Sequence, residues 1–166
     1  MGCLGLHFSL DAAQVAALQA VEDDERVEFV QEEFEETLWS DDKSRAQETD
    51  KSWDAIHRSL TDGTLGWESG EYPLNHVIFG GESLYDGDDY ILSLKSPEQV
   101  REVAAAVRGI TREKLRTGYD RIDPNAYGMP LSEEDFAYTW EWFQGVRDFY
   151  QRAAAAGHSV LFTADQ

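Results

Sequence analysis

The chain has 166 residues, of which 33 are acidic and 14 basic, and the net charge of −19 argues against nucleic-acid binding because phosphate contacts need a positive surface. Its 42% of hydrophobic residues suffice for the core of one domain, and no apolar run approaches the ~20 residues that span a bilayer. The single cysteine, Cys3, excludes an internal disulfide and, with no secretory signal pattern at the start, favours a cytoplasmic location and no membrane association.

The first part of the chain predicts a strand and two helices. Cys3–Ser9 alternates in polarity and predicts a strand, and an alanine-rich helix follows from Asp11 to about Ala20. A second helix is predicted from Asp23, because apolar residues step by three and four positions at Val27, Val30, Phe34 and Leu38. The residues between them form an acidic outer face, namely Glu28, Glu32, Glu33, Glu35 and Glu36.

The middle of the chain predicts a loop, a third helix and an irregular segment. Ser40–Glu48 is polar and reads as a loop, and the third helix runs from about Asp50 to Leu60. Thr64–Pro73 contains two glycines and a proline, which favour an irregular loop. We expect Trp67 or Tyr72 to anchor this loop to the body of the domain.

A short apolar run and two turns precede the middle strand. Val77–Phe79 is apolar, and Gly80-Gly81 then forces a turn or a close backbone approach. The turn at Asp86–Asp89 lacks the full spacing of a calcium loop and precedes a predicted strand, Tyr90–Leu94. Ser96-Pro97-Glu98 then begins a helix, with Ser as N-cap and Pro at the first helical position.

The last third of the chain predicts two helices and a strand. A short helix spans Thr111–Thr117, and Gly118–Pro130 forms a long polar connection. Ser132–Ala156 predicts a long buried helix, capped by Ser132 and ended by a left-handed Gly157. Its apolar face carries residues at spacings of three and four, Phe136, Trp140, Phe143, Arg147 and Tyr150. A final strand follows at Ser159–Thr163.

Together these elements predict an α+β fold. Strands at the two ends and in the middle of the chain suggest a small mixed sheet, with several helices packed on it. No linker or internal repeat divides the chain, so we expect one domain over residues 1–166.

The predicted third helix carries the most suggestive chemistry. Trp53 and His57 lie four residues apart on one face, with Asp50 one turn earlier, so an acidic neighbour could raise the basicity of His57. Two other readings stay open: Asp50 as a helix cap, and His57 as a packed histidine satisfied by one hydrogen bond.

A second group of candidates lies in the turns. His76 stands just before the Val77–Gly81 segment, and glycines at 80 and 81 let a ligand approach the backbone. Tyr119 and Asp120 open a polar aromatic loop of a kind that often carries binding groups. The chain contains no Walker loop, dinucleotide fingerprint or paired metal-ligand spacing, so we expect no cofactor and no metal.

The charge is uneven along the chain. Glu22–Asp50 holds 13 acidic and 3 basic residues, whereas Lys95–Arg121 holds 7 basic and 4 acidic residues. The acidic helix therefore predicts a docking surface for a basic protein at Glu32, Glu33, Glu35 and Glu36. A solvated surface that only keeps the protein soluble is the plainer interpretation.

Several of these segments resemble the YfbM-like family of uncharacterised bacterial proteins. The similar segments are Met1-Gly2, Asp50–His57, Val77–Leu84, Ser96–Val100, Tyr119-Asp120, Phe143–Tyr150 and Gly157–Phe162. The Lys-x-Trp-Asp-x-Ile-His pattern of Lys51–His57 is the most specific of them. The resemblance implies one compact α+β domain in the bacterial cytoplasm and transfers no reaction or catalytic residue.

Three functional hypotheses follow. The first is a non-enzymatic interaction protein, such as an acidic inhibitor or immunity-type partner of a basic protein. The second is a small-molecule-binding protein or enzyme, whose pocket gathers Asp50, Trp53, His57, His76, Gly80, Gly81, Tyr119 and Asp120. The third is an accessory subunit that self-associates through its uneven charge; the oligomeric state is left open.

Overall fold

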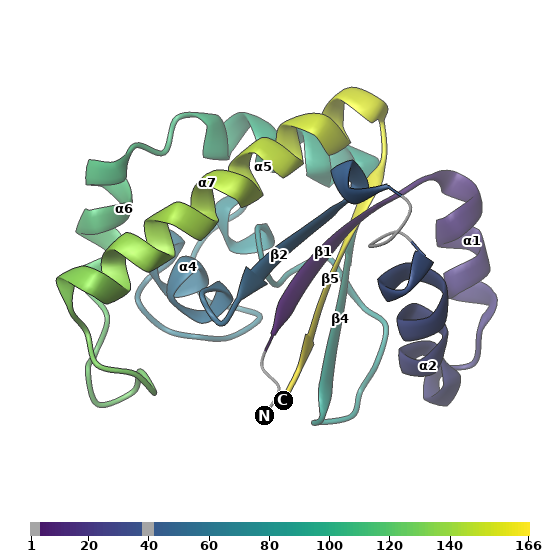
Figure 1. The fold of residues 1–166 in the computed structure, drawn as a ribbon, viewed down its shortest axis with the longest axis horizontal. Helices are drawn as coiled ribbons and strands as arrows, with labels where there is room; N and C mark the ends of the chain where they lie inside the picture. Colours follow the sequence, from purple (N-terminus) through teal and green to yellow (C-terminus); the bar gives the residue numbers. More distant parts are fainter. Residues whose placement is uncertain (1–3, 38–41) are drawn as a thin grey trace.

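The computed structural model describes residues 4–37 and 42–166. The predictions for Met1-Gly2, Cys3, Leu38 and the start of the Ser40 loop lie outside these residues. Figure 1 shows helices arranged around one twisted sheet. None of the described helices is long and apolar enough to cross a membrane.

The described strands form one sheet in the order β2-β1-β5-β4-β3. The strands are β1 (Gly5–Leu10), β2 (Ala46–Asp50), β3 (Glu82–Ser83), β4 (Tyr90–Lys95) and β5 (Ser159–Asp165). The predicted α+β class is confirmed, but the sheet is not mixed: all four pairings are antiparallel. The central pairing aligns Gly5 with Ala164 and Leu10 with Ser159, so the two ends of the domain meet in the middle of the sheet.

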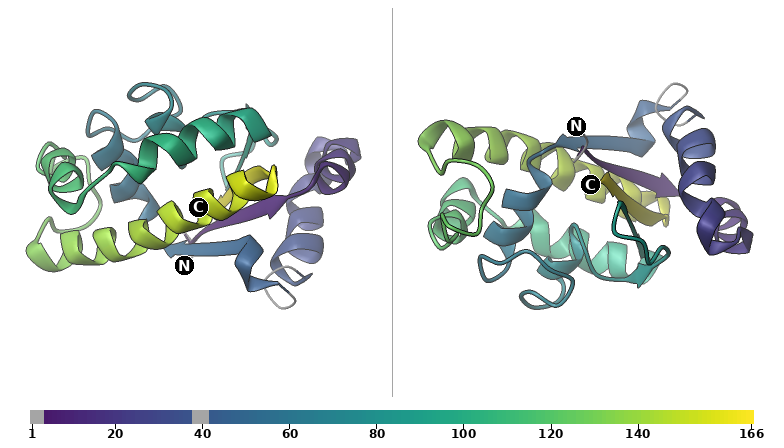
Figure 2. Two further views of the ribbon diagram at one scale, coloured as in Figure 1. Left: turned by 90° about the horizontal axis from the view of Figure 1, so that it is seen from above. Right: turned by 90° about the horizontal axis from the view of Figure 1, so that it is seen from below.

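Helices lie on both faces of the sheet (Figure 2). They are α1 (Ala12–Ala20), α2 (Arg26–Val30), α4 (Trp53–Leu60), α5 (Pro97–Arg108), α6 (Arg112–Tyr119) and α7 (Glu133–Ala156). Short turns of helix accompany them: η1 (Asp23–Glu25), η2 (Gln31–Glu35), η3 (Lys43–Arg45) and η4 (Leu74–His76). Because side chains alternate along a strand, β4 and β5 contribute to two separate cores.

The larger core lies between the sheet and helices α4 to α7. Phe162 and Ala164 of β5 pack there against Phe143 and Phe149 of α7. The smaller core lies on the opposite face, where Phe8, Leu92 and Leu161 pack against α1, α2 and η2.

The long helix α7 confirms its sequence signals. Ser132 caps it by accepting a hydrogen bond from the Asp135 backbone, and Gly157 ends it with φ of 71°. Phe136, Phe143 and Tyr150 are fully buried. Trp140 and Arg147 lie at the half-buried edge, where the guanidinium stands 5.5 Å from the indole centroid.

Two boundaries differ from the sequence prediction. The end of the predicted Ser40–Glu48 loop and the predicted start of the third helix at Asp50 both belong to β2, which pairs with β1, so α4 begins only at Trp53. The connection that the sequence predicts from Gly118 begins only after Tyr119, since α6 continues through that residue.

A buried polar cluster holds the segment after η4, where backbone carbonyls turn into the larger core. Tyr150 Oη and His7 Nε2 both donate to the Val77 carbonyl, at 2.7 and 2.9 Å. Lys95 Nζ donates to the Ile78 carbonyl and Ser93 Oγ to the Gly80 carbonyl. We call these four donors, His7, Ser93, Lys95 and Tyr150, the carbonyl clamp; all are completely buried.

We predict that Gly81→Ala destabilises the domain by more than about 2 kcal/mol. Gly81 has φ of 69°, and an added Cβ would stand 2.2 Å from the Leu94 carbonyl oxygen, which belongs to the sheet backbone. Urea unfolding checks this. Gly109→Ala is the matched control, because a Cβ there meets nothing within 4 Å; an equal effect at both positions would contradict the prediction.

Candidate functional site

The carbonyl clamp fixes Phe79, which is the centre of an aromatic cluster. The Phe79 ring meets Trp53 and His57 edge-on, at centroid distances of 5.9 and 4.8 Å. Trp67 stacks on it at 5.4 Å with an interplanar angle of 29°. Trp67 therefore anchors the Thr64–Pro73 loop to the body, as expected for one of the two aromatic residues there. Tyr72 makes a further contact, edge-on to His76 at 4.7 Å.

His57 holds the backbone of the same loop. Its Nε2 donates to the Gly66 carbonyl at 3.0 Å, and the ring is fully buried. Burial is the largest influence on its pKa, which falls to about 4. His57 thus matches the packed-histidine interpretation, and it orients the residue next to Trp67.

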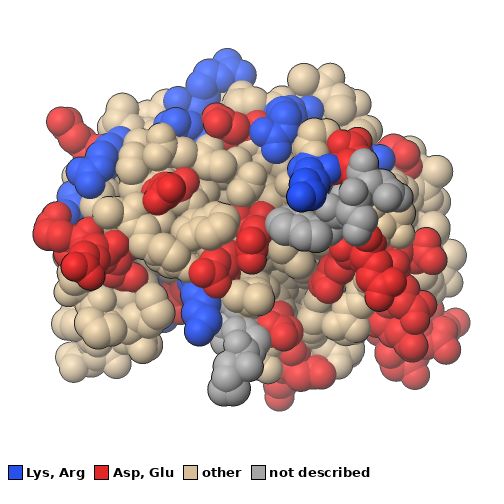
Figure 3. All heavy atoms as spheres, in the orientation of Figure 1, with Lys and Arg blue, Asp and Glu red and all other residues tan. Residues whose placement is uncertain are grey.

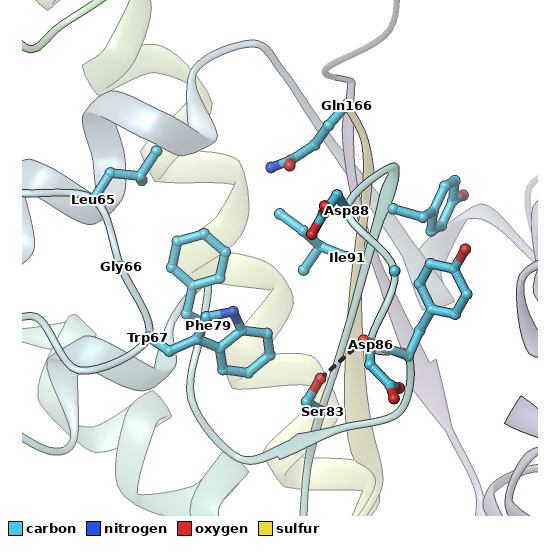
Figure 4. A pocket seen from close by; sticks show the side chains of 12 residues that line it. Leu65, Gly66, Trp67, Phe79, Ser83, Asp86, Asp88, Ile91 and Gln166 are labelled. Atoms are coloured by element: carbon cyan, nitrogen blue, oxygen red, sulfur yellow. Dashed lines mark hydrogen bonds between the residues drawn. The ribbon is translucent and has the colours of Figure 1, made fainter.

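A surface cavity of about 610 Å³ opens beside this aromatic cluster (Figure 4). Trp67 and Phe79 form one side, and Asp86 and Asp88 stand across from them. Ile91 lies between the two sides, and Gln166 closes one end. We call this space the aromatic–acidic cavity.

The acidic side of the cavity is the turn between β3 and β4. Asp89 anchors it, since its carboxylate accepts from Tyr85 Oη at 2.7 Å and its carbonyl accepts from the Gln166 backbone at 3.0 Å. The pKa of Tyr85 is raised, first by this hydrogen bond, and also by the charges of Asp86 and Asp88. The turn therefore holds several negative charges close together at the cavity mouth.

The acidic helix forms a second notable surface. Figure 3 shows carboxylates concentrated over the α1–α2 side and most Lys and Arg along the upper edge. We call the exposed carboxylates of this side the acidic face: Glu22, Asp23, Asp24, Glu25, Glu28, Glu32, Glu33 and Glu36. Arg26 pairs with Asp23 at 2.8 Å, and its guanidinium also donates to the Leu84 carbonyl, which ties the helix to the sheet side.

Glu35 differs from the other predicted docking residues. It is half-buried, and its carboxylate accepts a hydrogen bond of 2.5 Å from Tyr90 Oη of β4. The π-helical turn η2 carries this residue. Glu32, Glu33 and Glu36 remain exposed, so they are the part of the predicted set available to a partner.

Five of the eight predicted ligand residues lie around the Phe79–Gly81 segment. Trp53 and His57 contact the Phe79 ring, and His76 lies directly under Gly80, where a Cβ would come within 2.5 Å of its Nδ1. Gly80 and Gly81 form the turn itself, with φ of 81° and 69°.

The other three lie elsewhere. Asp50 ends β2 with φ of 49°, and its carboxylate accepts from Tyr138 Oη at 2.6 Å rather than capping α4. Tyr119 donates to Asp135 at 2.7 Å, and Asp120 pairs with Arg116 at 2.9 Å. Tyr119 and Asp120 line a separate cavity of about 240 Å³ beside Glu133. The structure thus brings five of the eight residues together and leaves these three apart, while a ligand-binding role for any of them stays a prediction.

Sequence reasoning did not select the residues that line the aromatic–acidic cavity. The sequence predicts Trp67 or Tyr72 as the anchor of a loop and Asp86–Asp89 as a turn, and it assigns Phe79 no binding role. The available signal was an aromatic residue in a glycine-rich loop together with an acidic turn; nothing in the sequence places the two side by side. No cluster of three metal-ligating side chains occurs in residues 4–37 and 42–166.

The comparisons with known proteins agree with the resemblance seen in the sequence. The family model described as "Domain of unknown function (DUF1877)" matches residues 1–163. The crystal structure of a protein of unknown function, YfbM from Escherichia coli, is similar with a TM-score of 0.69. The identity is 24%, over 97% of this chain and 99% of that chain, so this likeness shows the fold. No curated protein matches the chain.

The buried His7 predicts a loss of stability in acid. Burial is the main reason that its pKa falls from 6.5 to about 3. Below pH 6.5 the His7 imidazole therefore binds a proton in the unfolded chain but stays neutral in the folded chain. The free energy of unfolding consequently falls as the pH falls. We predict that, from pH 7 to pH 5, the free energy of unfolding of the wild type falls by about 2 kcal/mol more than that of the His7→Gln variant. The variant has no titrating group at position 7.

Urea unfolding of both proteins at the two pH values measures this difference. Every other group, including His57 and the many carboxylates, is common to both proteins and cancels in the comparison. Equal pH dependence in the two proteins would show that His7 is not held neutral in the folded state.

Proposed function

The chain belongs to the family described as domain of unknown function (DUF1877), and from that premise we propose that it is a non-enzymatic binding protein for a basic protein partner. We place this role in the bacterial cytoplasm, where the protein would act as an inhibitor or immunity-type partner. The acidic face is the docking surface.

One observation carries this proposal: the carboxylates of the acidic face lie close together on one side of the domain, and few basic side chains neutralise them. Among the described residues, Asp23 with Arg26 is the ion pair formed within this face. Crowded like charges repel one another and disfavour the folded state, whereas an opposite charge on a partner relieves the repulsion. Such complementary fields speed encounter and fix orientation.

The helical segment that carries the acidic face is held to the sheet by buried apolar side chains and by hydrogen bonds. Val30 and Phe34 bury their side chains in the smaller core, and Glu35 and Arg26 bind the sheet side. The exposed glutamates therefore lie on a helical segment whose inner face is packed against the domain, which suits a preformed docking surface.

We predict that Glu32→Gln, Glu33→Gln and Glu36→Gln together weaken the partner complex about tenfold and reduce its salt dependence. The complex is purified from the native bacterium at low salt and quantified by native mass spectrometry. A stoichiometric basic protein that dissociates as salt rises is the expected result with the wild type.

The matched control carries Glu113→Gln, Glu141→Gln and Asp148→Asn. These three carboxylates are also exposed, lie on α6 and α7, and give the same change in net charge. The control should keep wild-type binding. The proposal fails if both triple variants bind equally, or if no stoichiometric basic protein is recovered.

A further inference from the structure

The aromatic–acidic cavity combines two features that each favour a positive charge. Trp67 is 37% exposed although it stacks on Phe79, so part of its ring system remains open to a ligand. An indole face is the best aromatic partner for a cation. Phe79 is only 4% exposed and braces the indole from the core side.

Among the residues that the structure describes, none offers a cationic partner to the carboxylates across the cavity. In residues 4–37 and 42–166, the ion pairs involve Asp23, Asp54, Asp120 and Glu133, and none includes Asp86 or Asp88. Tyr85 and Ser83 stabilise the turn through the Asp89 carboxylate and the Tyr85 carbonyl, which leaves the other two carboxylates for a ligand.

The dimensions of the cavity suit a small organic group. Its volume of about 610 Å³ lies within the range of ligand pockets, roughly 300–1,000 Å³. Ile91 and Phe79 supply an apolar floor for the body of such a group. A hydrated metal ion would make no use of the aromatic wall, and an anion would be repelled by the turn.

We propose that the aromatic–acidic cavity binds a guanidinium group. A planar guanidinium stacks on an indole and offers a fork of N–H donors that matches carboxylate geometry, whereas an ammonium is a compact, strongly hydrated point charge. The group could belong to an arginine side chain of a polypeptide or to a free small guanidine, since both present the same chemistry to Trp67, Asp86 and Asp88.

This inference stands apart from the proposed function. The acidic face lies on residues 22–36, over η1, α2 and η2, while the cavity lies at the β3–β4 turn and the Trp67 loop. Tyr90 lines the cavity and also donates to Glu35, beneath the acidic face. Neutralising the acidic face with Glu32→Gln, Glu33→Gln and Glu36→Gln should leave guanidinium binding within about twofold of the wild type. Failure of either proposal is therefore visible without the other.

The experiment uses protein labelled with 5-fluorotryptophan, in which the fluorine NMR signal of Trp67 is identified by its loss in Trp67→Phe. Three probes are titrated: N-acetyl-arginine amide, agmatine and N-acetyl-citrulline amide. The citrulline compound has nearly the shape of the arginine compound and no charge. We expect the two guanidinium compounds to shift the Trp67 signal at concentrations where the citrulline compound does not.

The probes also separate the two sources of the group. Shifts with both guanidinium compounds mean that an arginine within a polypeptide fits the cavity. A shift with agmatine alone supports a free small guanidine. Equal binding of the citrulline compound, or no shift of the Trp67 signal with either guanidinium compound, would overturn the proposal.

A matched pair of variants tests the acidic side. Asp86→Asn with Asp88→Asn should weaken N-acetyl-arginine amide binding about tenfold, because two charge-assisted contacts are lost. The control, Glu113→Gln with Glu141→Gln, removes the same charge on α6 and α7, outside the cavity lining. It should not weaken the binding of N-acetyl-arginine amide. Equal losses in the two double variants would show general charge attraction and no site. Circular dichroism of each variant confirms that these exposed substitutions leave the fold intact.

Discussion

The candidate site depends on the way in which the carbonyls of Val77, Ile78 and Gly80 are satisfied inside the larger core. An unpaired buried carbonyl costs about as much as a lost hydrogen bond, so a segment that turns its backbone inward needs donors from elsewhere. The carbonyl clamp supplies them from β1, β4 and α7. Because the segment is fixed, Phe79 is fixed, and because Phe79 is fixed, Trp67 has a surface on which to stack.

The two faces of the sheet are built in different ways. The smaller core is almost entirely apolar, with Phe8, Leu92 and Leu161 under α1 and α2. The opposite face of the same strands carries His7, Ser93 and Lys95, all completely buried. Burial drives the pKa of Lys95 well below its usual range. This polar face is specific in its geometry, since each donor meets a buried backbone carbonyl at a fixed position. The apolar face supports the helical segment that carries the acidic face.

The parts of this fold that the sequence predicts are those encoded by local signals. Ser132 and Gly157 mark the ends of α7, and Ser96-Pro97 marks the start of α5, because caps act within a few residues. Strand β2 was missed because Ala46–Asp50 has no strand-like composition and is defined by its pairing with β1. Lys95 contributes to the basic segment in the sequence but is buried in the structure. Its partner, the Ile78 carbonyl, lies 17 residues away, so no local sequence signal predicts this burial. The cavity was missed for the same reason: its two sides come from separate loops that only the tertiary structure brings together.

The edges of the sheet also have a consequence for behaviour at high concentration. β3 is two residues long, and β2 carries Gln47, Glu48 and Asp50 among its five residues. Strands at a sheet edge expose unpaired backbone groups on which another chain can build a β-ladder, and short or charged edges discourage this. Growth of the sheet from one molecule into the next is therefore disfavoured at both ends, so we expect crowding to leave the protein dispersed rather than in cross-β aggregates.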